Sequence, residues 1–214
     1  MVALAIISVV IAYLIGSVNF AVIFSNLFMK KDVRSMGSGN AGATNVMRNG
    51  GFLPGALTFI CDALKGFVAS YIGYLVFDYM MHFTNWSMAI YGAYACGTAC
   101  MLGHVFPIYY QFKGGKGVAT SVGIFAVCCP IAIVIGLVVF AIVTAISKYV
   151  SLASIIATVT VVSLSIYFYD IYASIYPQIF FIVTMGSIVI LKHSTNIKRL
   201  INGTESKIGK GGKK

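Results

Sequence analysis

Long apolar runs separated by short polar connections follow one another along almost the whole chain. The runs lie at about 2–28, 54–77, 87–109, 117–130, 131–147, 152–169 and 177–191. A helix needs about 20 apolar residues to cross the hydrocarbon core of a bilayer. These runs are continuous and do not alternate with polar positions as the strands of a membrane barrel do. The pattern therefore predicts an all-α, polytopic membrane protein with seven transmembrane helices.

The uncharged stretch 117–147 allows either one tilted helix or two short spans. A break near Cys128-Cys129-Pro130 favours two, because proline removes a backbone donor and disrupts a helix. With two crossings, every basic cluster falls on one side of the membrane. Those clusters contain Lys30, Lys31, Arg34, Arg48, Lys113, Lys116, Lys148, Lys192, Lys198, Arg199 and the Lys-rich tail, and the opposite connections contain Asp78, His82 and Asp170.

Lysine and arginine gather on the cytoplasmic side of membrane proteins. This rule predicts an external N-terminus, a cytoplasmic C-terminus and cytoplasmic basic loops. We expect residues 1–200 to form a single transmembrane domain and residues 201–214 to form a basic cytoplasmic tail.

The composition agrees with a membrane protein. Hydrophobic residues make up 59% of the chain and charged residues 9%, whereas soluble domains have about 45–50% and about 25%. We interpret the net charge of +10 as basic residues that flank spans and face anionic lipid. No aromatic residues are interleaved with a basic soluble patch, so we expect no nucleic-acid partner.

The first basic loop is rich in groups that bind anions. Its glycines, Gly37, Gly39 and Gly42, alternate with Ser, Asn and Thr, and Arg48 follows. Such spacing lets backbone N–H groups converge on an anion, and the planar fork of arginine suits a phosphate or carboxylate. A flexible polar connector is the alternative, but a connector needs no such density of donors.

A second loop of the same kind reads Gly114-Gly115-Lys116-Gly117 and comes directly before an apolar run. An open backbone, a lysine and a helix N-terminus together favour an anion. The spacing differs from that of a Walker A loop. The two loops together predict a substrate that is rich in phosphate.

Further polar residues lie at span ends or inside a span. Ser151 and Ser154 open the sixth span on one helix face, where capping and packing are the alternatives to a binding role. His193 and Asn196 share a face where the last span ends, and this pairing favours a site over simple solvation. Asp62 and Lys65 lie one turn apart inside the second span, where a structural ion pair and a direct role both remain open.

Common catalytic machinery is missing from the sequence. No histidine is followed five positions later by the aspartate found in many acyltransferases that use acyl-CoA or acyl carrier protein. A serine elbow with a Ser-His-Asp triad is not recognisable, and three scattered histidines do not indicate a metal site. We expect no metal and no cofactor.

The motifs, in order along essentially the whole chain, resemble those of the bacterial acyl-phosphate:glycerol-3-phosphate acyltransferase family. They are Gly37-Ser38-Gly39-Asn40, Gly42-Ala43-Thr44-Asn45 with Arg48, Gly103-His104 with Phe106-Pro107, Gly114-Gly115-Lys116-Gly117-Val118-Ala119-Thr120, and His193 with Asn196-Ile197-Lys198-Arg199-Leu200 and Gly203. Ala41 stands where the family often has proline, and Gly16-Ser17-Val18-Asn19 departs from its Gly-Ser-x-Pro segment.

This resemblance implies a seven-helix enzyme of the bacterial inner membrane with its active site facing the cytoplasm. It would act in phospholipid biosynthesis and transfer a fatty acyl group from acyl phosphate to the 1-hydroxyl of sn-glycerol 3-phosphate. The products would be lysophosphatidate and phosphate. The expected partners are these two substrates and membrane lipid, with no obligate protein partner.

The resemblance also implies roles for individual residues. The catalytic set would be Ser38, Arg48, Lys116, His193 and Asn196. The acyl-phosphate head and the developing oxyanion would be held by Ser38, Asn40, Thr44, Gly114, Lys116, Asn196 and one or both of Ser151 and Ser154. Glycerol 3-phosphate would be bound by Arg48 and Lys116, and His193 would orient a phosphate or a hydroxyl, with general-base work as the alternative.

Acyl phosphate is already activated, so a strong protein nucleophile is not needed. The resemblance implies direct attack by the glycerol hydroxyl, with a phosphate group of the bound substrate helping as base. The protein would then supply positioning and charge stabilisation. A membrane transporter of a small organic anion is the alternative function, and it predicts broken helices with polar residues near mid-membrane. Here the polar motifs lie at span ends on one side, which favours chemistry at the membrane surface. A lipid-binding scaffold would not need Arg48 or Lys116 individually.

Overall fold

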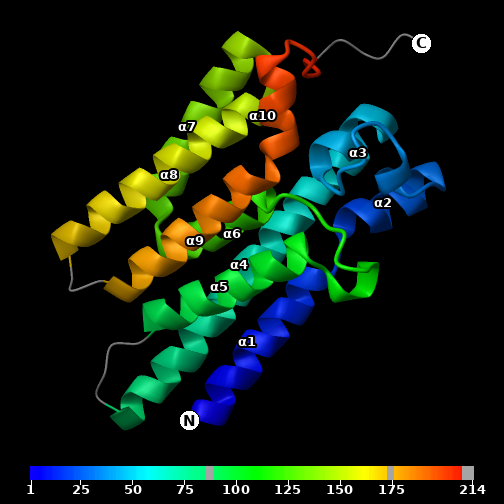
Figure 1. The fold of residues 1–214 in the computed structure, drawn as a ribbon. Helices are drawn as coiled ribbons and strands as arrows, with labels where there is room; N and C mark the ends of the chain where they lie inside the picture. Colours follow the sequence, from blue (N-terminus) through cyan, green and yellow to red (C-terminus); the bar gives the residue numbers. More distant parts are fainter. Residues whose placement is uncertain (85–88, 173–175, 209–214) are drawn as a thin grey trace. The chain divides into compact units, whose positions relative to one another are not determined.

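The computed structural model describes residues 1–84, 89–172 and 176–208, and the secondary structure in these ranges is helical (Figure 1). The chain forms two compact units, Met1–Cys128 and Cys129–Lys214. The side chains of His82 and Asp170, which we predicted to lie opposite the basic clusters, are outside the described residues, as are positions 209–214 of the tail.

The structure confirms an all-helical protein with several helices suited to a membrane. The segments long and apolar enough to cross a bilayer are Val2–Met29, Phe52–Met80, Ala89–Tyr110, Pro130–Ser147 and Val150–Phe168. A pair bent by 51°, Gln178–Lys192 with Ser194–Ile201, would make a sixth if it formed one span, and Val118–Cys128 is a shorter apolar helix. The chain is thus a multi-pass membrane protein, and the number of seven spans stays a prediction.

In residues 1–84 and 89–128, the first unit contains six α-helices and two short 3-10 helices. They are α1 (Val2–Ser17), α2 (Phe20–Met29), η1 (Val33–Ser35), α3 (Ala43–Gly50), α4 (Phe52–Thr84), α5 (Ala89–Val105), η2 (Ile108–Tyr110) and α6 (Val118–Cys128). The predicted continuous run 2–28 is interrupted at Val18 and Asn19. Val18 is extended, and the Asn19 side chain accepts a hydrogen bond from the N–H of Val22, which caps the start of α2.

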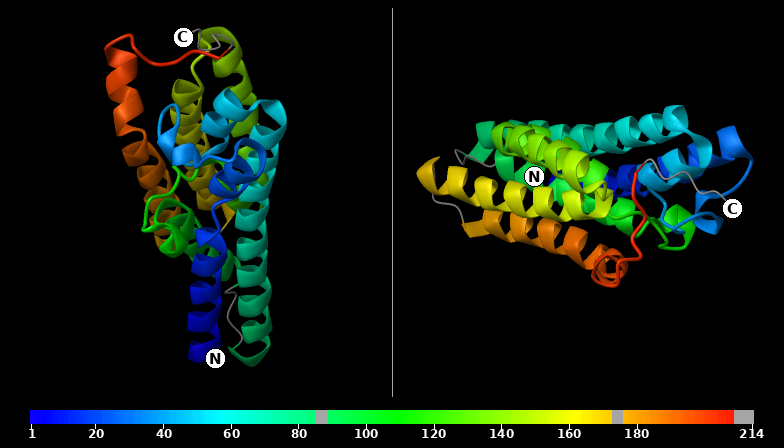
Figure 2. Two further views of the ribbon diagram at one scale, coloured as in Figure 1. Left: turned by 90° about the vertical axis from the view of Figure 1, so that its right-hand side faces the viewer. Right: turned by 90° about the horizontal axis from the view of Figure 1, so that it is seen from above.

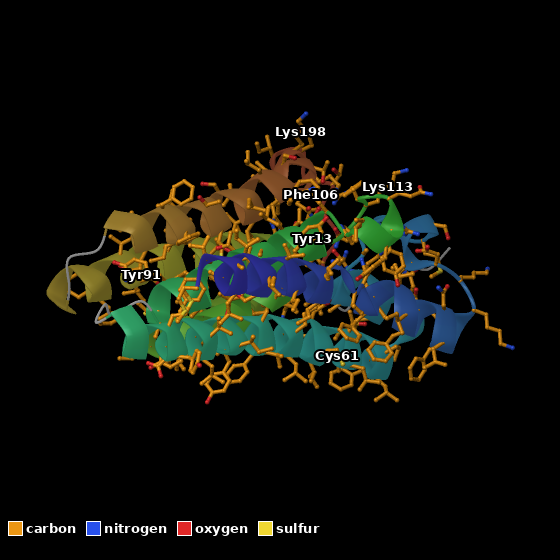
Figure 3. The ribbon with its side chains drawn as sticks, turned by 90° about the horizontal axis from the view of Figure 1, so that it is seen from below. Tyr13, Cys61, Tyr91, Phe106, Lys113 and Lys198 are labelled. Atoms are coloured by element: carbon orange, nitrogen blue, oxygen red, sulfur yellow. The ribbon has the colours of Figure 1, made fainter. Side chains whose placement is uncertain are left out.

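Helix α4 packs against α1, α5 and α6, as the views in Figures 1 and 2 also show. Close approach depends on glycine. A methyl group at Gly73 of α4 or at Gly92 of α5 would collide with the carbonyl oxygen of the other. Small residues at helix crossings are typical of membrane proteins, where they let backbones meet. The Tyr13 hydroxyl of α1 donates to the Phe106 carbonyl oxygen over 2.8 Å, which ties α1 to the end of α5 (Figure 3).

The polar loops of the first unit rest on a small apolar core at the end of the unit away from the N-terminus (Figure 1). That core consists of Ala21, Val22, Val33, Ala41 and Val46, with Met29, Met36 and Tyr110 packed against it. Because α2, η1 and α3 all contribute residues to this core, the backbone of the first basic loop is held in place and its polar side chains have fixed positions.

The second unit consists of α7 (Pro130–Ser147), α8 (Val150–Tyr172), α9 (Tyr176–Lys192) and α10 (Ser194–Ile201). The predicted break at Cys128-Cys129-Pro130 is present, since α6 ends at Cys128 and α7 begins at Pro130. Proline suits this first position because its missing N–H would have no partner within the helix. After α10 the chain returns towards α8, and the N–H of Ile208 donates to the Lys148 carbonyl oxygen over 2.8 Å.

Candidate active site

Asn45 organises the first basic loop from inside. Its side chain is buried, and its amide nitrogen donates to the carbonyl oxygens of Val33, Met36 and Asn40 over 3.0–3.1 Å. Its amide oxygen accepts from the N–H of Ser38 over 3.2 Å. Gly37 adopts φ +54°, and a side chain there would collide with the Asn45 side chain. The loop is therefore an ordered structure and not a flexible connector.

The predicted polar residues of this loop lie on its outer side. Ser38 is exposed and Asn40 is half-buried, both between η1 and α3. Thr44 lies in the first turn of α3, and Arg48 lies one turn further along the same helix face. The first N–H groups of a helix have no partner within it and carry a partial positive charge. Thr44, Arg48 and the start of α3 thus form a face that suits an anion.

Arg34 ties this loop to the chain that follows α5. Its guanidinium forms an ion pair with Asp32 at 2.7 Å, donates to the Tyr110 carbonyl oxygen over 3.2 Å and lies over the Tyr110 ring. The hydrogen bond from Arg34, which outweighs the opposing effect of burial, lowers the pKa of Asp32. Arg34 thus holds the loop in place, and our sequence analysis assigned no binding role to it.

The Gly-Gly-Lys-Gly loop packs against the end of α5. The N–H of Gly115 donates to the His104 carbonyl oxygen over 3.1 Å, and a side chain at Gly114 would collide with the same oxygen. Gly117 has φ +85°, a conformation that favours glycine, and α6 begins at the next residue. Lys116 is half-buried at this helix start, whereas Lys113 points away from the helices (Figure 3).

The two predicted anion loops are in contact. A methyl group on Gly115 would lie 2.6 Å from the Ala41 carbonyl oxygen, which is closer than real methyl groups come to neighbouring atoms. Gly115 immediately precedes Lys116, and Ala41 immediately follows Asn40. The first unit therefore brings the backbones of both loops together, as two phosphate-binding elements of one site would require.

The second unit gathers its predicted polar residues around a carboxylate that our sequence analysis missed. Glu205 has only 8% of its surface exposed. Its Oε1 accepts from Ser151 Oγ over 2.9 Å and from Asn196 Nδ2 over 2.7 Å, and its Oε2 accepts from Arg199 Nε over 2.8 Å. Ser154 differs, because its hydroxyl donates to the Val150 carbonyl oxygen of its own helix.

The environment of Glu205 keeps its carboxyl group ionised. Burial raises the pKa of Glu205, but hydrogen bonds from Asn196, Arg199 and Ser151 and the charge of Arg199 together outweigh burial, so the pKa lies below its ordinary value. An ionised carboxylate accepts stronger hydrogen bonds than a neutral group. Ser151 and Asn196 are accordingly held in fixed orientations.

His193 is buried at the junction of α9 and α10. Its Nδ1 lies 2.8 Å from the Val189 carbonyl oxygen, which can only accept a hydrogen bond. Nδ1 therefore carries a proton, and in the neutral ring Nε2 is an acceptor. An acceptor at Nε2 suits a hydroxyl or a protonated phosphate oxygen, and the role of His193 in orienting a phosphate or a hydroxyl stays a prediction.

Each unit by itself presents groups that suit an anion. The first unit has helix starts, an arginine, a lysine, hydroxyls and amides, which can bind phosphate and stabilise a developing oxyanion, and the second unit has two serines, an amide and a histidine. Within residues 1–84, 89–172 and 176–208, no group of three or more His, Cys, Asp or Glu could hold a metal ion.

Comparison with known sequences decides the family. The sequence model described as "Glycerol-3-phosphate acyltransferase" matches residues 6–203, which is almost the whole chain.

The chain belongs to the glycerol-3-phosphate acyltransferase family.

Several relatives carry this name. A glycerol-3-phosphate acyltransferase of Thermoanaerobacter sp. (strain X514) is 43% identical over 206 residues, covering 96% of both chains. Glycerol-3-phosphate acyltransferase 2 of Bacillus anthracis is 39% identical over 203 residues, covering 95% of this chain and 98% of the relative.

A solved structure of PlsY (YgiH), described as an integral membrane glycerol 3-phosphate acyltransferase in its glycerol 3-phosphate form, is also similar. Its TM-score is 0.82, with 34% identity over 96% of both chains. The lysophosphatidic acid form of PlsY has a TM-score of 0.78 and 33% identity, covering 96% of this chain and 95% of that one.

Two residues of this acyltransferase were overlooked in the sequence for different reasons. Asn45 was part of a recognised motif, but nothing in the pattern distinguished an amide that faces inwards from one that faces a ligand. Glu205 lies in a segment that we took for a basic tail. It is the only acidic residue after Asp170, and an isolated carboxylate among lysines was a signal that could have been used.

Proposed function

We propose that this protein transfers a fatty acyl group from acyl phosphate to the 1-hydroxyl of sn-glycerol 3-phosphate, yielding lysophosphatidate and phosphate for phospholipid biosynthesis. The observation that carries the proposal is the match to glycerol-3-phosphate acyltransferases over nearly the whole chain. Solved relatives whose descriptions name a glycerol 3-phosphate form and a lysophosphatidic acid form support the acceptor and the product.

Acyl phosphate as the donor is supported by the two anion loops and by the missing His–Asp pair of the enzymes that use acyl-CoA or acyl carrier protein. Both substrates would then carry a phosphate group, and the first unit has two anion-binding loops in contact at Gly115 and Ala41. An acyl phosphate is an activated mixed anhydride, so no protein nucleophile is needed. The glycerol oxygen attacks the acyl carbon, the bond from that carbon to the bridging oxygen breaks, and phosphate leaves. The hydroxyl proton passes to a phosphate oxygen of the substrate.

The residues of the first unit divide between the two phosphates in this proposal. Ser38, Asn40 and Thr44 with the backbone of Gly114 hold the acyl-phosphate head. Arg48 binds the phosphate of glycerol 3-phosphate, because a planar fork matches two phosphate oxygens. Lys116 neutralises charge on the departing phosphate and on the oxyanion, which grows only as the reaction proceeds.

The residues of the second unit complete these assignments. Asn196 donates to the acyl-phosphate head or the oxyanion, and Glu205 orients its amide by a hydrogen bond. The hydroxyl protons of Ser151 and Ser154 are directed at Glu205 and at the Val150 carbonyl oxygen, so either serine would turn its hydroxyl to join Asn196 in this role. His193 orients a phosphate or a hydroxyl through Nε2, since its Nδ1 is directed at Val189.

A donor comparison tests this function. Purified protein in mixed detergent and lipid micelles is incubated with radiolabelled glycerol 3-phosphate and either palmitoyl phosphate, palmitoyl-CoA or palmitoyl-acyl carrier protein. We expect labelled lysophosphatidate with palmitoyl phosphate only. Comparable turnover with palmitoyl-CoA would overturn both the donor and the direct-attack mechanism. Accumulation of unmodified glycerol 3-phosphate inside proteoliposomes, without acylation, would instead support a transporter.

The proposed topology has seven spans, an external N-terminus and a cytoplasmic active site in the inner membrane. It is supported by the sidedness of the basic clusters and by the break between α6 and α7. A cysteine is introduced at Ser35 in one variant and at Lys148 in another, both exposed positions, and is labelled with an impermeant thiol reagent in right-side-out and inverted vesicles. A background with Cys61→Ala removes the native thiol that is not buried. Labelling of the two positions from opposite faces contradicts this topology.

A further inference from the structure

Three ionisable side chains are buried together inside the first unit, apart from the residues assigned above. Asp62 and Lys65 belong to α4 and His104 to the end of α5, with 1%, 5% and 4% of their surfaces exposed. Lys65 Nζ lies 2.8 Å and His104 Nδ1 lies 3.5 Å from Asp62 Oδ1. Ionisable groups inside membrane helices are costly. A structural ion pair would account for Asp62 and Lys65, but it would not account for His104.

Lys65 links this cluster to the break in the first apolar run. Its Nζ donates to the carbonyl oxygen of Val18 over 2.6 Å and lies 5.7 Å from the centre of the Phe20 ring. Val18 is the C-cap residue directly after α1, and the last carbonyl groups at the end of a helix have no partner within it. Lys65 therefore provides a hydrogen-bond donor for the Val18 carbonyl oxygen, which has no helical partner because of the break between α1 and α2. Helix α2 then continues to the first loop.

His104 links the cluster to the Gly-Gly-Lys-Gly loop. Its carbonyl oxygen accepts from the N–H of Gly115, and a methyl group on Gly115 would collide with its Nε2. One edge of the ring thus faces Asp62 while the other lies against Gly115. Gly115 is the residue at which this loop contacts Ala41 of the first loop. The ring therefore lies directly beneath the contact between the two loops.

We infer that Asp62, Lys65 and His104 form a positioning cluster that sets the place of the Gly-Gly-Lys-Gly loop, and hence of Lys116, relative to the first loop. Asp62 fixes the orientation of the His104 ring, and the ring supports Gly115. His104 is a positioning residue, since it acts on the substrate only through the loop. This inference rests on the proposed function, because Lys116 is taken to act on the acyl phosphate.

The inference differs from a structural ion pair in one measurable way. Replacing both partners of a buried ion pair by neutral groups is often harmless to stability, whereas removing one partner leaves an uncompensated charge. The double variant Asp62→Asn with Lys65→Gln removes both charges and keeps an N–H donor for the Val18 carbonyl oxygen, but it also removes the carboxylate beside His104. We expect this double variant to keep its thermal midpoint near that of the wild type, with kcat about 10- to 100-fold lower, because small displacements of catalytic groups cost that much.

A cycle of variants tests whether the effect passes through Lys116. His104→Ala is expected to lower kcat by about 10- to 100-fold. In a Lys116→Ala background, the same change should lower kcat by less than about twofold, because residues that act through one another are not additive. His104→Gln, which can still reach Gly115, should recover part of the loss. Thr58→Val is the matched control, since Thr58 is buried on α4 and its hydroxyl donates to Pro54 of the same helix.

Steady-state kinetics with palmitoyl phosphate and glycerol 3-phosphate and thermal unfolding in detergent are measured for every variant. Wild-type kcat in the neutral Asp62/Lys65 double variant would overturn the inference and leave a structural ion pair. Additive losses from His104→Ala and Lys116→Ala would overturn it as well. Lack of turnover by the wild type would refute the proposed function instead, so the two failures are distinguishable.

Discussion

Replacing Glu205 by glutamine removes one negative charge and keeps the size of the side chain. In the native protein, Oε1 accepts from Ser151 and Asn196, and Oε2 accepts from Arg199. Glutamine offers one accepting oxygen and one donating nitrogen. If the amide oxygen of the introduced glutamine faced Ser151 and Asn196, its amide nitrogen would face Arg199, and two donors would meet. In the opposite orientation, Ser151 and Asn196 would lose their acceptor.

The expected loss can be estimated from these contacts. A hydrogen bond to a charged group contributes about 1.5–3 kcal/mol, whereas an exposed ion pair contributes about 0–1 kcal/mol. Arg199 has 37% of its side chain exposed, so its contact with the carboxylate contributes at most about 1 kcal/mol. Weaker bonds to Ser151 and Asn196 add to the loss. We expect Glu205→Gln to lose about 2–3 kcal/mol of local stability.

The effect should depend on pH in a defined direction. The folded-state pKa of Glu205 is lowered, because bonds from Asn196, Arg199 and Ser151 outweigh the opposing effect of burial. A group with a lowered pKa stabilises the fold above its unfolded pKa, about 4.3 for glutamate, and this contribution is lost as the pH falls through the folded pKa. The difference between wild type and variant should be full at pH 7 and shrink below about pH 4.

Thermal unfolding in detergent micelles between about pH 2.5 and pH 8, with kcat measured at pH 7, checks this prediction. Lys207→Met is the control, because Lys207 lies in the same segment and its ammonium lies over the Tyr149 ring. The control should keep its kcat, whereas Glu205→Gln should lose activity as Asn196 and Ser151 lose their fixed orientations. A Glu205→Gln variant as stable and active as the wild type at pH 7 would refute the reasoning. A stability difference that does not change with pH would refute the assignment to an ionised carboxylate.

Substitutions at three residues of the first unit test the other assignments by steady-state kinetics. Arg48→Ala should mainly raise the KM for glycerol 3-phosphate and cost about 2–4 kcal/mol in kcat/KM, and Arg48→Lys should recover only part, because the bidentate geometry is lost. An unchanged KM for glycerol 3-phosphate would exclude this role. Lys116→Ala should lower kcat at saturating substrates, and wild-type kcat with both KM values unchanged would reduce the loop to a connector. Asn45→Leu should lower kcat/KM for both substrates together with the thermal midpoint, because three carbonyl oxygens lose their donor; native kinetics would contradict its organising role.

The membrane helices were predictable because their physics is local. A bilayer forces backbone hydrogen bonds inside each segment, so continuous apolar runs become helices without regard to their neighbours. Proline disrupts a helix whatever its neighbours are, so the break before Pro130 could be predicted from the sequence. The interruption at Val18 and Asn19 was not found. It depends on a distant donor, Lys65, and on a capping side chain that is equally compatible with a continuous helix.

The candidate residues were predictable as a set, but their contacts were not. Glycine, hydroxyl and amide residues at close spacing indicated anion loops, and the structure brings the two loops of the first unit into contact at Gly115 and Ala41. Which side chains face inwards depends on tertiary packing. Asn45 faces inwards and Ser38 is exposed, although both belong to one motif. Glu205 was missed because we interpreted the C-terminal segment from its many lysines, as a basic tail, and did not consider its single carboxylate.

Acyl transfer from acyl phosphate to glycerol 3-phosphate is tested most directly with a doubly labelled donor. Palmitoyl phosphate with tritium in the acyl chain and ³²P in the phosphate is incubated with the purified protein and glycerol 3-phosphate. Direct attack predicts that all transferred tritium appears in lysophosphatidate, that all released ³²P appears as inorganic phosphate, and that the two amounts are equal. Release of ³²P without equal formation of tritiated lysophosphatidate, or ³²P in the lipid product, would contradict the proposed reaction.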